Sequence, residues 1–226
     1  MEVFKAFFRF SMFIFENMKA PKNYPLPDDD SPISSVNEID FSAIYSYRDY
    51  MRFTFDERLE IIKGHVFNMS PAPARLHQKI STNIFGPLYN ALKNKKCEVY
   101  AAPFDVRLAK KGTADAEIFN VVQPDLVVIC DLQKLDERGC IGAPDIVIEI
   151  LSPGNNKKEL GIKYEVYEEA GVKEYWIINP LNQTVTQHLN NGQYKFTSKN
   201  SYHLNQELNS TILPSFSLPL SEIFLN

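Results

Sequence analysis

Two apolar segments of the sequence each carry one acidic residue well inside or at the start of the run: QPDLVVIC contains Asp125, and APDIVIEIL contains Glu149. Both segments have the composition of buried β-strands, where an unpaired carboxylate is costly. If the two strands pair antiparallel with Cys130 opposite Pro144, then Asp125 faces Glu149, because both pairs of numbers sum to 274. Residues directly opposite each other lie about 4.5–5.5 Å apart at Cβ. The spacing therefore predicts two carboxylates that converge on one face of a sheet.

A converging acidic pair needs a proton or a cation, since two like charges about 4 Å apart repel by roughly 4 kcal/mol at an effective dielectric constant of 20. Mg²⁺ prefers hard oxygen ligands and is commonly held by one or two carboxylates, waters and a substrate phosphate. Such a site suits hydrolysis of a phosphodiester. A purely structural interpretation is also open, in which an arginine or backbone amides satisfy Glu149.

Two other acids lie near this pair in the sequence. Asp145 shares a strand face with Glu149, but four residues of strand span about 13 Å, too far for one ion. We interpret Asp145 as a strand-entry or turn residue. Asp105, in the segment PFDVRLA, is a second-tier candidate that would reach the site from the next position in the sheet.

A lysine follows the Glu149 strand on a predicted helix over residues 158–170. At about 100° per residue, Lys163 falls between Tyr167 and Ala170 on the inward-facing stripe. It would bring an ammonium group to the acidic pair and stabilise charge on a phosphate or position a water. The alternative is a lysine whose stem packs at the edge of the stripe while its head reaches solvent.

The remaining pattern predicts the elements that position these residues. Apolar residues at helical spacing indicate a long helix over 74–93, with His77 on the same stripe, and Lys63-Gly64 and Asn191-Gly192 mark two hairpin turns. Strands are expected in CEVYAAPFDVRLA, VVQPDLVVIC, PDIVIEIL and EYWIIN. Together they predict a mixed α/β domain over residues 39–226, with a β-sheet flanked by helices. Residues 1–38 are expected to form an N-terminal extension and a linker outside this domain.

Composition limits the classes of function. The chain has 226 residues, a formal net charge of −4 and 44% hydrophobic residues, typical of a soluble globular protein. An acidic balance argues against a protein that coats nucleic acid through bulk charge. A local basic rim remains open, although an ordinary solvated surface is the simpler interpretation of the same side chains: Lys93, Lys95, Lys96, Lys110, Lys111, Lys157 and Lys158.

The three cysteines, Cys97, Cys130 and Cys140, show neither CxxC spacing nor an even count. We therefore expect no disulfide framework and no zinc site, and a reducing cytoplasm as the setting. The N-terminal segment MEVFKAFFRFSMFIFENMKA is interrupted by charges, so neither a membrane span nor a secretory signal is expected. An amphipathic helix, or a true start at Met18, are both consistent with it.

Several motifs together resemble the Uma family of restriction-endonuclease-like proteins, within the PD-(D/E)XK nuclease superfamily. The resemblance is carried by QPDLVVI, GAPDIVIEILSPG and ELGIKYEVYEEAGVKEYWIINP, with KGHVFNMSPAPARLHQKI and LPSFSLPLSEIF on either side. It runs from about residue 40 to the end of the chain. The resemblance implies a restriction-endonuclease-like core and a divalent-metal nuclease centre in which Asp125 and Glu149 are the acidic residues.

The resemblance has two departures. The superfamily lysine two residues after the central acid is replaced by Leu151, and the family supplies it instead from the following helix, here Lys163. The family also usually has Glu where this chain has His65, which either alters metal binding or is simply an exposed hairpin residue. His77 matches a recurrent family histidine, and a satisfied core histidine is the alternative role.

These observations predict a Mg²⁺- or Mn²⁺-dependent endonuclease acting on DNA, with the metal held by Asp125, Glu149 and the backbone carbonyl of Ile150. Cutting both strands would favour a homodimer, and no membrane partner is expected. Two alternatives stay open at this point: a nuclease-fold module that binds nucleic acid or protein without catalysis, and a metal phosphoesterase for small nucleotides. No base-reading motif indicates a recognition sequence.

Overall fold

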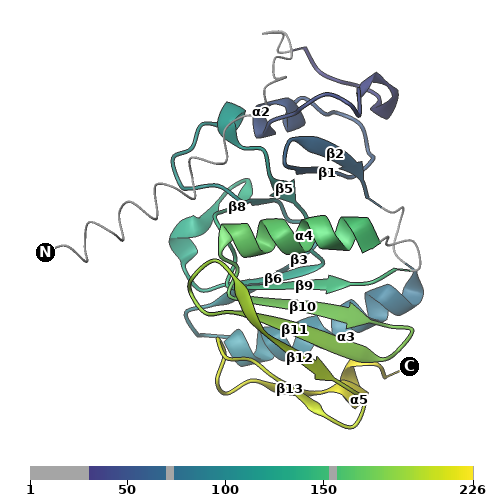
Figure 1. The fold of residues 1–226 in the computed structure, drawn as a ribbon, viewed down its shortest axis with the longest axis vertical. Coiled ribbons are helices and arrows are strands. Elements are labelled where there is room, and N and C mark those ends of the chain that lie inside the picture. The colour runs from purple at the N-terminus through teal and green to yellow at the C-terminus, as the bar shows by residue number, and fades with distance from the viewer. Residues whose placement is uncertain (1–30, 70–73, 153–156, 226) are drawn as a thin grey trace, which may run out of the picture.

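The computed structural model describes residues 31–69, 74–152 and 157–225. Over these residues the chain forms two six-stranded sheets and a small two-stranded one, with helices between and around them. Figure 1 shows α4 (Lys157–Ala170) lying between the two large sheets, and α3 (Arg75–Leu92) on the far side of the lower sheet. The predicted extension falls mainly outside the described residues. Within residues 31–38, Ile33 forms a bridge with Phe53 and packs against the domain.

The central sheet contains the strands that carry the acidic pair. Its middle strand β9 (Ile146–Ile150) is buried along its whole length, as expected of a continuous apolar run with both faces covered. Strand β9 runs parallel to β10 (Glu174–Asn179) and antiparallel to β6 (Leu126–Ile129). The sheet is completed by β3 (Glu98–Ala101) beside β6, and by β11 (Thr184–Asn190) and β12 (Phe196–Tyr202) beyond β10.

A second sheet lies on the other side of α4. The sequence pattern predicts one sheet, and the structure divides its strands between two. The division arises at Gln123–Asp125, where the chain leaves β5 and enters β6 through Pro124, which has no N–H to continue a ladder. In spatial order the second sheet consists of β2 (His65–Asn68), β1 (Leu59–Ile62), β5 (Val121–Val122), β4 (Val106–Arg107), β8 (Gly139–Ile141) and β7 (Leu135–Asp136).

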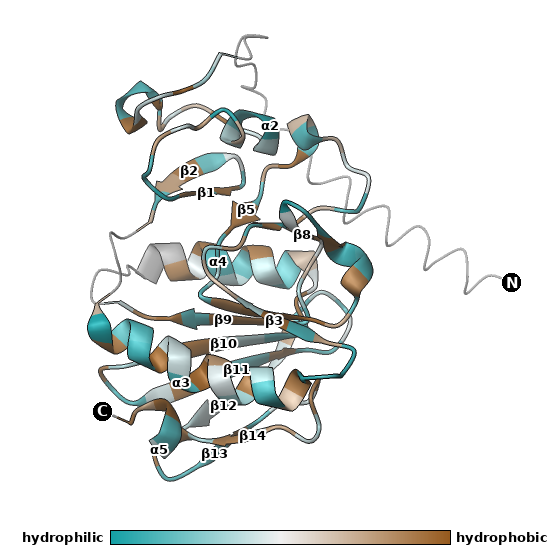
Figure 2. Ribbon diagram, turned by 180° about the vertical axis from the view of Figure 1, so that it is seen from behind, coloured by the Kyte–Doolittle hydropathy of each residue, from teal (hydrophilic) through white to brown (hydrophobic). Residues whose placement is uncertain are grey.

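Helices cover both faces of the central sheet. On one face, α3 (Arg75–Leu92) and α5 (Leu220–Ile223) pack against Ile146 and Ile148. On the other, α4 (Lys157–Ala170) packs Val166 and Tyr167 against the opposite side of β9. In Figure 2, α3 carries hydrophobic and hydrophilic residues in alternating patches, as expected of a helix with one buried face.

The smaller described elements are α2 (Tyr47–Tyr50), three 3₁₀ helices and a short hairpin near the C-terminus. The 3₁₀ helices are η1 (Val36–Glu38), η2 (Asp115–Glu117) and η3 (Leu132–Lys134). The hairpin pairs β13 (Glu207–Asn209) with β14 (Ser217–Pro219). No helix among the described residues is both long enough and apolar enough to cross a membrane.

Local chemistry explains two of the predicted boundaries. Lys63 and Gly64 both have positive φ, 52° and 81°, which is the geometry of a type I′ hairpin turn between β1 and β2. Helix α4 ends at Gly171, with φ 86°. There the N–H of Val172 donates to the carbonyl of Tyr167 at 3.0 Å and satisfies one of the last carbonyls of the helix.

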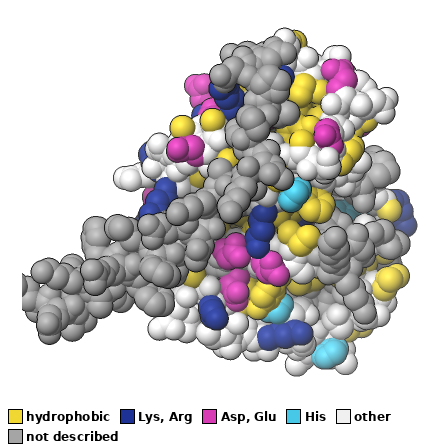
Figure 3. All heavy atoms as spheres, turned by 45° about the horizontal axis from the view of Figure 1, so that its top comes forward, with side chains coloured by type: hydrophobic (Ala, Val, Ile, Leu, Met, Phe, Trp, Pro, Cys, Tyr) yellow, Lys and Arg dark blue, Asp and Glu magenta, His cyan; other side chains and the backbone are white. Residues whose placement is uncertain are grey.

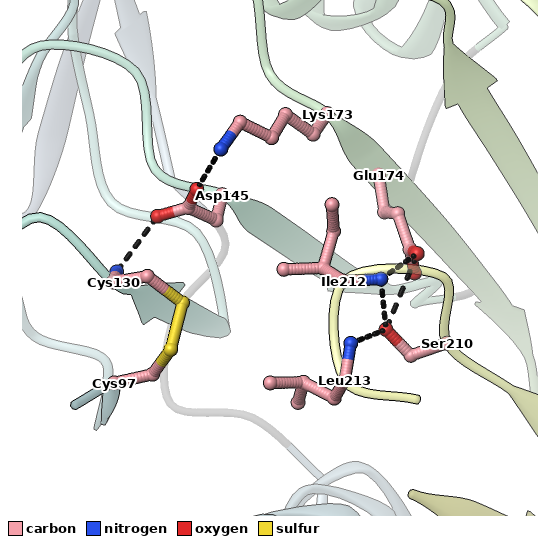
Figure 4. Close-up of a disulfide and its surroundings, with 8 residues drawn as sticks. All are labelled: Cys97, Cys130, Asp145, Lys173, Glu174, Ser210, Ile212 and Leu213. Carbon is pink, nitrogen blue, oxygen red and sulfur yellow. Dashed lines mark hydrogen bonds and ion pairs between the residues drawn. A yellow bond between two sulfur atoms is a disulfide. The ribbon is translucent and has the colours of Figure 1, made fainter. Parts of the chain in front are cut away.

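The cysteine prediction is wrong for one pair. Cys97 and Cys130 form a disulfide, drawn in Figure 4, while Cys140 is free and buried. The reason is the register of β3 on β6: Glu98 pairs with Ile129, so the preceding and following residues, Cys97 and Cys130, lie opposite each other. Counting cysteines and their spacing could not reveal this pairing, because it depends on strand partners 33 residues apart.

Candidate active site

The register of β6 on β9 is the predicted one. Leu126 lies opposite Ile148, and Val127 opposite Val147, so both pairs sum to 274. Continuing this register by one residue sets Asp125 opposite Glu149. The two residues also share the side of the sheet occupied by Val127 and Val147, which is the side that α4 covers. The strand ends therefore present two carboxylates to the same helix.

Asp125 is held at the end of β6 by two contacts to its Oδ2 atom. The backbone N–H of Ile150 donates to it at 2.7 Å, and Nε2 of His77 lies 3.3 Å away. The same His77 nitrogen lies 3.1 Å from the carbonyl oxygen of Ile150. Helix α3 thus contributes a histidine that joins both strand ends from the opposite side of the sheet, and His77 is placed within the candidate site.

Glu149 is held on the α4 side through its Oε1 atom. Lys163 Nζ donates to it at 2.9 Å, and the hydroxyl of Tyr167 donates at 2.7 Å. Lys163 and Tyr167 are one helical turn apart, so they project from the same face of α4. The predicted inward orientation of Lys163 is what the structure has, since its side chain is only 7% exposed.

A third carboxylate, absent from the sequence prediction, completes the cluster. Glu60 lies in β1, on the second sheet, and its Oε1 accepts from Lys163 Nζ at 3.0 Å and from the backbone N–H of Gln123 at 2.8 Å. One ammonium group therefore bridges acids from both sheets. The sequence did hold a signal: LEII is an apolar strand with one acid in it, the same pattern that singled out Glu149.

Burial and charge shift the ionisation of this cluster. Burial, opposed by Lys163 and assisted by the charges of Asp125 and Glu60, raises the pKa of Glu149 to about 7. Burial alone would lower the pKa of Lys163, but Glu149 and Glu60 outweigh it and raise that pKa, so Lys163 stays protonated. For His77, burial is outweighed by the hydrogen bond and charge of Asp125, and its pKa is raised.

The other sequence candidates lie outside the acidic pair. Asp105 accepts hydrogen bonds from Tyr50 and Gln123, so it reaches Glu60 only through the Gln123 residue. His65 is exposed at the start of β2. Asp145 immediately precedes β9, where its carboxylate accepts from the N–H of Cys130 and pairs with Lys173, in keeping with a strand-entry residue (Figure 4).

The donor atoms fit a magnesium-type site. Among the described residues, the hydrogen bonds of Asp125 and Glu149 all go to one oxygen of each carboxylate, which leaves Oδ1 and Oε2 for a ligand. The carbonyl of Ile150 has a second lone pair beside its His77 contact. Within the same residues no group of three or more His, Cys, Asp or Glu side chains is arranged to hold a metal. Two carboxylates and a carbonyl suit Mg²⁺, which is commonly held by one or two carboxylates and keeps several waters.

On the face drawn in Figure 3, Lys and Arg side chains lie scattered among acidic and apolar ones. Of the predicted basic rim, Lys157 and Lys158 have side chains outside the described part.

The fold and the comparisons define the class of protein. A mixed sheet with two strand-end acids, flanked by helices, is a restriction-endonuclease-like core. The sequence matches the Uma2 family, described as "Putative restriction endonuclease", over residues 46–221, and the chain belongs to this family.

Comparison with solved structures agrees on the fold. The crystal structure of a "putative nuclease belonging to DUF820" from Anabaena variabilis ATCC 29413 matches with a TM-score of 0.64 and 17% sequence identity. The match covers 80% of this chain and 97% of that one. No curated protein matches the sequence.

Proposed function

We propose that this protein is a divalent-metal-dependent endonuclease that hydrolyses phosphodiester bonds in DNA. The observation that carries the proposal is the pairing of Asp125 and Glu149 at adjacent strand ends, each with one carboxylate oxygen outside the hydrogen bonds described above. Family membership supports the same reading. Mg²⁺ or Mn²⁺ would be held by these two carboxylates and by the carbonyl of Ile150, and when bound it would supply a polarised water and a clamp on the scissile phosphate.

The protein's own groups would orient these ligands. The N–H of Ile150 and the ring of His77 fix one oxygen of Asp125, so its other oxygen has a defined direction. Lys163 and Tyr167 do the same for Glu149. With Asp125 22% exposed and Glu149 11% exposed at the side chain, substrate would approach from the Asp125 side of the pair.

Lys163 would act on the charge of the reacting phosphate. Glu60 and Glu149 take two of its three donors, and among the described residues no partner takes the third. We propose that this N–H contacts a phosphate oxygen or the attacking water. Because Lys163 remains protonated, its role would be electrostatic rather than that of a base.

The test is DNA cleavage by matched variants. Wild type, Asp125→Ala, Glu149→Ala and the exposed-acid control Glu57→Ala are compared on single- and double-stranded DNA with Mg²⁺, with Mn²⁺ and with EDTA. Wild type and Glu57→Ala should cleave only with metal, and the other two should not cleave. Equal cleavage by all four proteins would refute the assignment of the site.

Metal binding separates this function from its main alternative. Calorimetric titration with Mn²⁺ should show binding to the wild type that is lost in Asp125→Ala. If the wild type neither binds Mn²⁺ nor cleaves DNA, the chain is a non-catalytic nuclease-fold module. A homodimer, needed to cut both strands at once, is part of the proposal and is tested by light scattering during gel filtration. The cytoplasmic setting stays a prediction.

A further inference from the structure

A second cavity lies at the opposite end of β6 and β9 from the acidic pair. It has a volume of about 620 Å³, within the usual range for small-molecule sites. It is lined by residues after β6, such as Gln133, and residues before β9, such as Ala143, together with the last turn of α4. Because the four residues from Asp125 to Ile129 already span about 13 Å, this cavity is separate from the candidate active site.

Two of the lysines that line the cavity are held by backbone carbonyls rather than by carboxylates. Four lysines line it, Lys110, Lys111, Lys134 and Lys173, and the last of these pairs with Asp145 at 2.6 Å. The ammonium group of Lys111 donates to the carbonyl of Gln133, and that of Lys134 to the carbonyl of Ala143, each at 2.8 Å. A neutral carbonyl fixes an ammonium group in place and leaves its charge and its other donors for a ligand.

Two acids also lie in the wall. The carboxylate of Asp131 accepts from the backbone N–H of Gln133, and Glu169 pairs with Lys63. A further donor is unused: Nδ2 of Asn190 is buried and has no hydrogen-bond partner among the described residues, although Asn190 lines the cavity. A buried amide without a partner is costly, and a ligand with acceptor oxygens would satisfy it.

The rest of the lining is apolar and aromatic. Leu108, Ile141 and Val166 are buried and form part of the wall. Tyr194, on the β11–β12 connection, is 40% exposed and lies against Gly171 at the end of α4. Figure 1 shows this connection beside that end of the helix. An aromatic ring on the rim and an aliphatic wall suit a planar, weakly polar ring rather than an inorganic ion alone.

We propose that this cavity binds a nucleotide, with the phosphate on Lys111, Lys134 and the Asn190 amide and the base against Tyr194 and the aliphatic wall. The ligand is either a free mononucleotide or the phosphorylated end of a nucleic-acid strand, which share this chemistry. The proposal does not depend on the nuclease activity, since no residue of the cavity belongs to the acidic cluster.

Calorimetry on the full chain in EDTA tests the proposal, with 2′-deoxyadenosine 5′-monophosphate as the probe. The nucleotide should bind at least tenfold more tightly than inorganic phosphate or deoxyadenosine alone, because only the nucleotide uses both halves of the cavity. Lys111→Gln combined with Lys134→Gln should weaken it tenfold or more, since each change removes a charge-assisted hydrogen bond. If the double variant is unstable, Lys111→Gln alone, at an exposed position, should still weaken nucleotide binding.

Matched variants locate the site. Tyr194→Ala should weaken nucleotide binding without changing phosphate binding, and the exposed control Lys199→Gln should change neither. Glu149→Gln should bind the nucleotide as the wild type does. The idea is overturned by an absence of nucleotide binding, by phosphate binding as tightly as the nucleotide, by an unaffected lysine double variant, or by loss of binding in Glu149→Gln.

Oligonucleotides distinguish the two sources of the ligand. A short strand with a 5′-phosphate that competes with the mononucleotide, when the unphosphorylated strand does not, identifies a strand end as the ligand. If neither strand competes while the mononucleotide binds, the ligand is the free nucleotide. Both outcomes support a nucleotide site and differ only in where the nucleotide comes from.

Discussion

Two buried glutamates in this molecule, Glu149 and Glu174, have their negative charges stabilised in different ways. Glu174 begins β10 and is fully buried, yet no cation contacts it among the described residues. Its two oxygens accept six hydrogen bonds from neutral groups in Ser210, Thr211, Ile212, Trp176 and Gln187. Figure 4 shows part of this arrangement around the loop of residues 210–213.

The hydrogen bonds of Glu149 are arranged differently from those of Glu174. One oxygen takes donors from Lys163 and Tyr167, the other takes none from the described residues, and the pKa is raised to about 7. Burial of a carboxylate is therefore no sign of chemistry in itself. A carboxylate whose two oxygens both accept hydrogen bonds from neutral donors connects one segment of the chain to another. A carboxylate that has one oxygen without such a bond and a cation nearby can accept a ligand.

The largest effect should come from removing the charge of Glu149. Glu149→Gln should lower DNA cleavage about a thousandfold or more, equivalent to roughly 4 kcal/mol of transition-state stabilisation, because a metal ligand is lost. The fold should persist, as measured by circular dichroism, because Lys163 keeps its bond to Glu60. A fully active Glu149→Gln protein would remove the contrast between the two glutamates.

Replacing Lys163 with an uncharged residue should show how much its ammonium group stabilises the two buried carboxylates. Lys163→Met leaves Glu149 and Glu60 buried without their shared partner, and should lower the free energy of unfolding by about 3–5 kcal/mol at pH 8. The loss should shrink as the pH falls towards 7, because the pKa of Glu149 rises further without Lys163, and the protonated carboxyl group needs no cation. Urea denaturation at pH 8 and pH 5.5 measures both values, with Lys199→Met as the exposed control. A pH-independent loss would contradict the account.

The complementary change at Glu174 should affect stability instead of activity. Glu174→Gln puts an NH₂ group among donors and should lower the free energy of unfolding by about 3 kcal/mol. Cleavage per folded molecule should stay at the wild-type level. Urea denaturation gives the first quantity, with the exposed Glu207→Gln as control, and cleavage assays at a temperature where the variant is folded give the second. A selective loss of cleavage would mean that Glu174 is more than a structural anchor.

The smallest effect should come from one hydroxyl group. Tyr167→Phe removes a donor to the ionised form of Glu149, costs about 1 kcal/mol of stability and raises the pKa of Glu149 further, by less than about one unit. The acid limb of the pH profile for cleavage should therefore move to higher pH. Tyr175→Phe is the matched control, because the buried Tyr175 hydroxyl has no hydrogen-bond partner among the described residues. A shift of the profile in the control and not in Tyr167→Phe would contradict this role.

Sequence alone led to the acidic pair and the lysine because each follows from a local pattern. Two apolar runs with one acid each determined the register, and the helical phase of α4 determined the direction of Lys163. The catalytic and metal-binding roles of these residues stay predictions. What could not be foreseen depends on pairing between distant segments: Glu60 approaches from a second sheet, and Cys97 meets Cys130 only through the β3–β6 register.

The arrival of Lys163 from a helix instead of a strand has a consequence for the order in which the chain matures. Glu60 emerges from the ribosome about one hundred residues before Lys163, which among the described residues is the group that bonds both Glu60 and Glu149. Until α4 has been synthesised and has docked between the two sheets, the acids have no common partner. Under the proposed function, a partly made or partly unfolded chain should therefore not cleave DNA, because the acidic cluster is complete only in the finished fold.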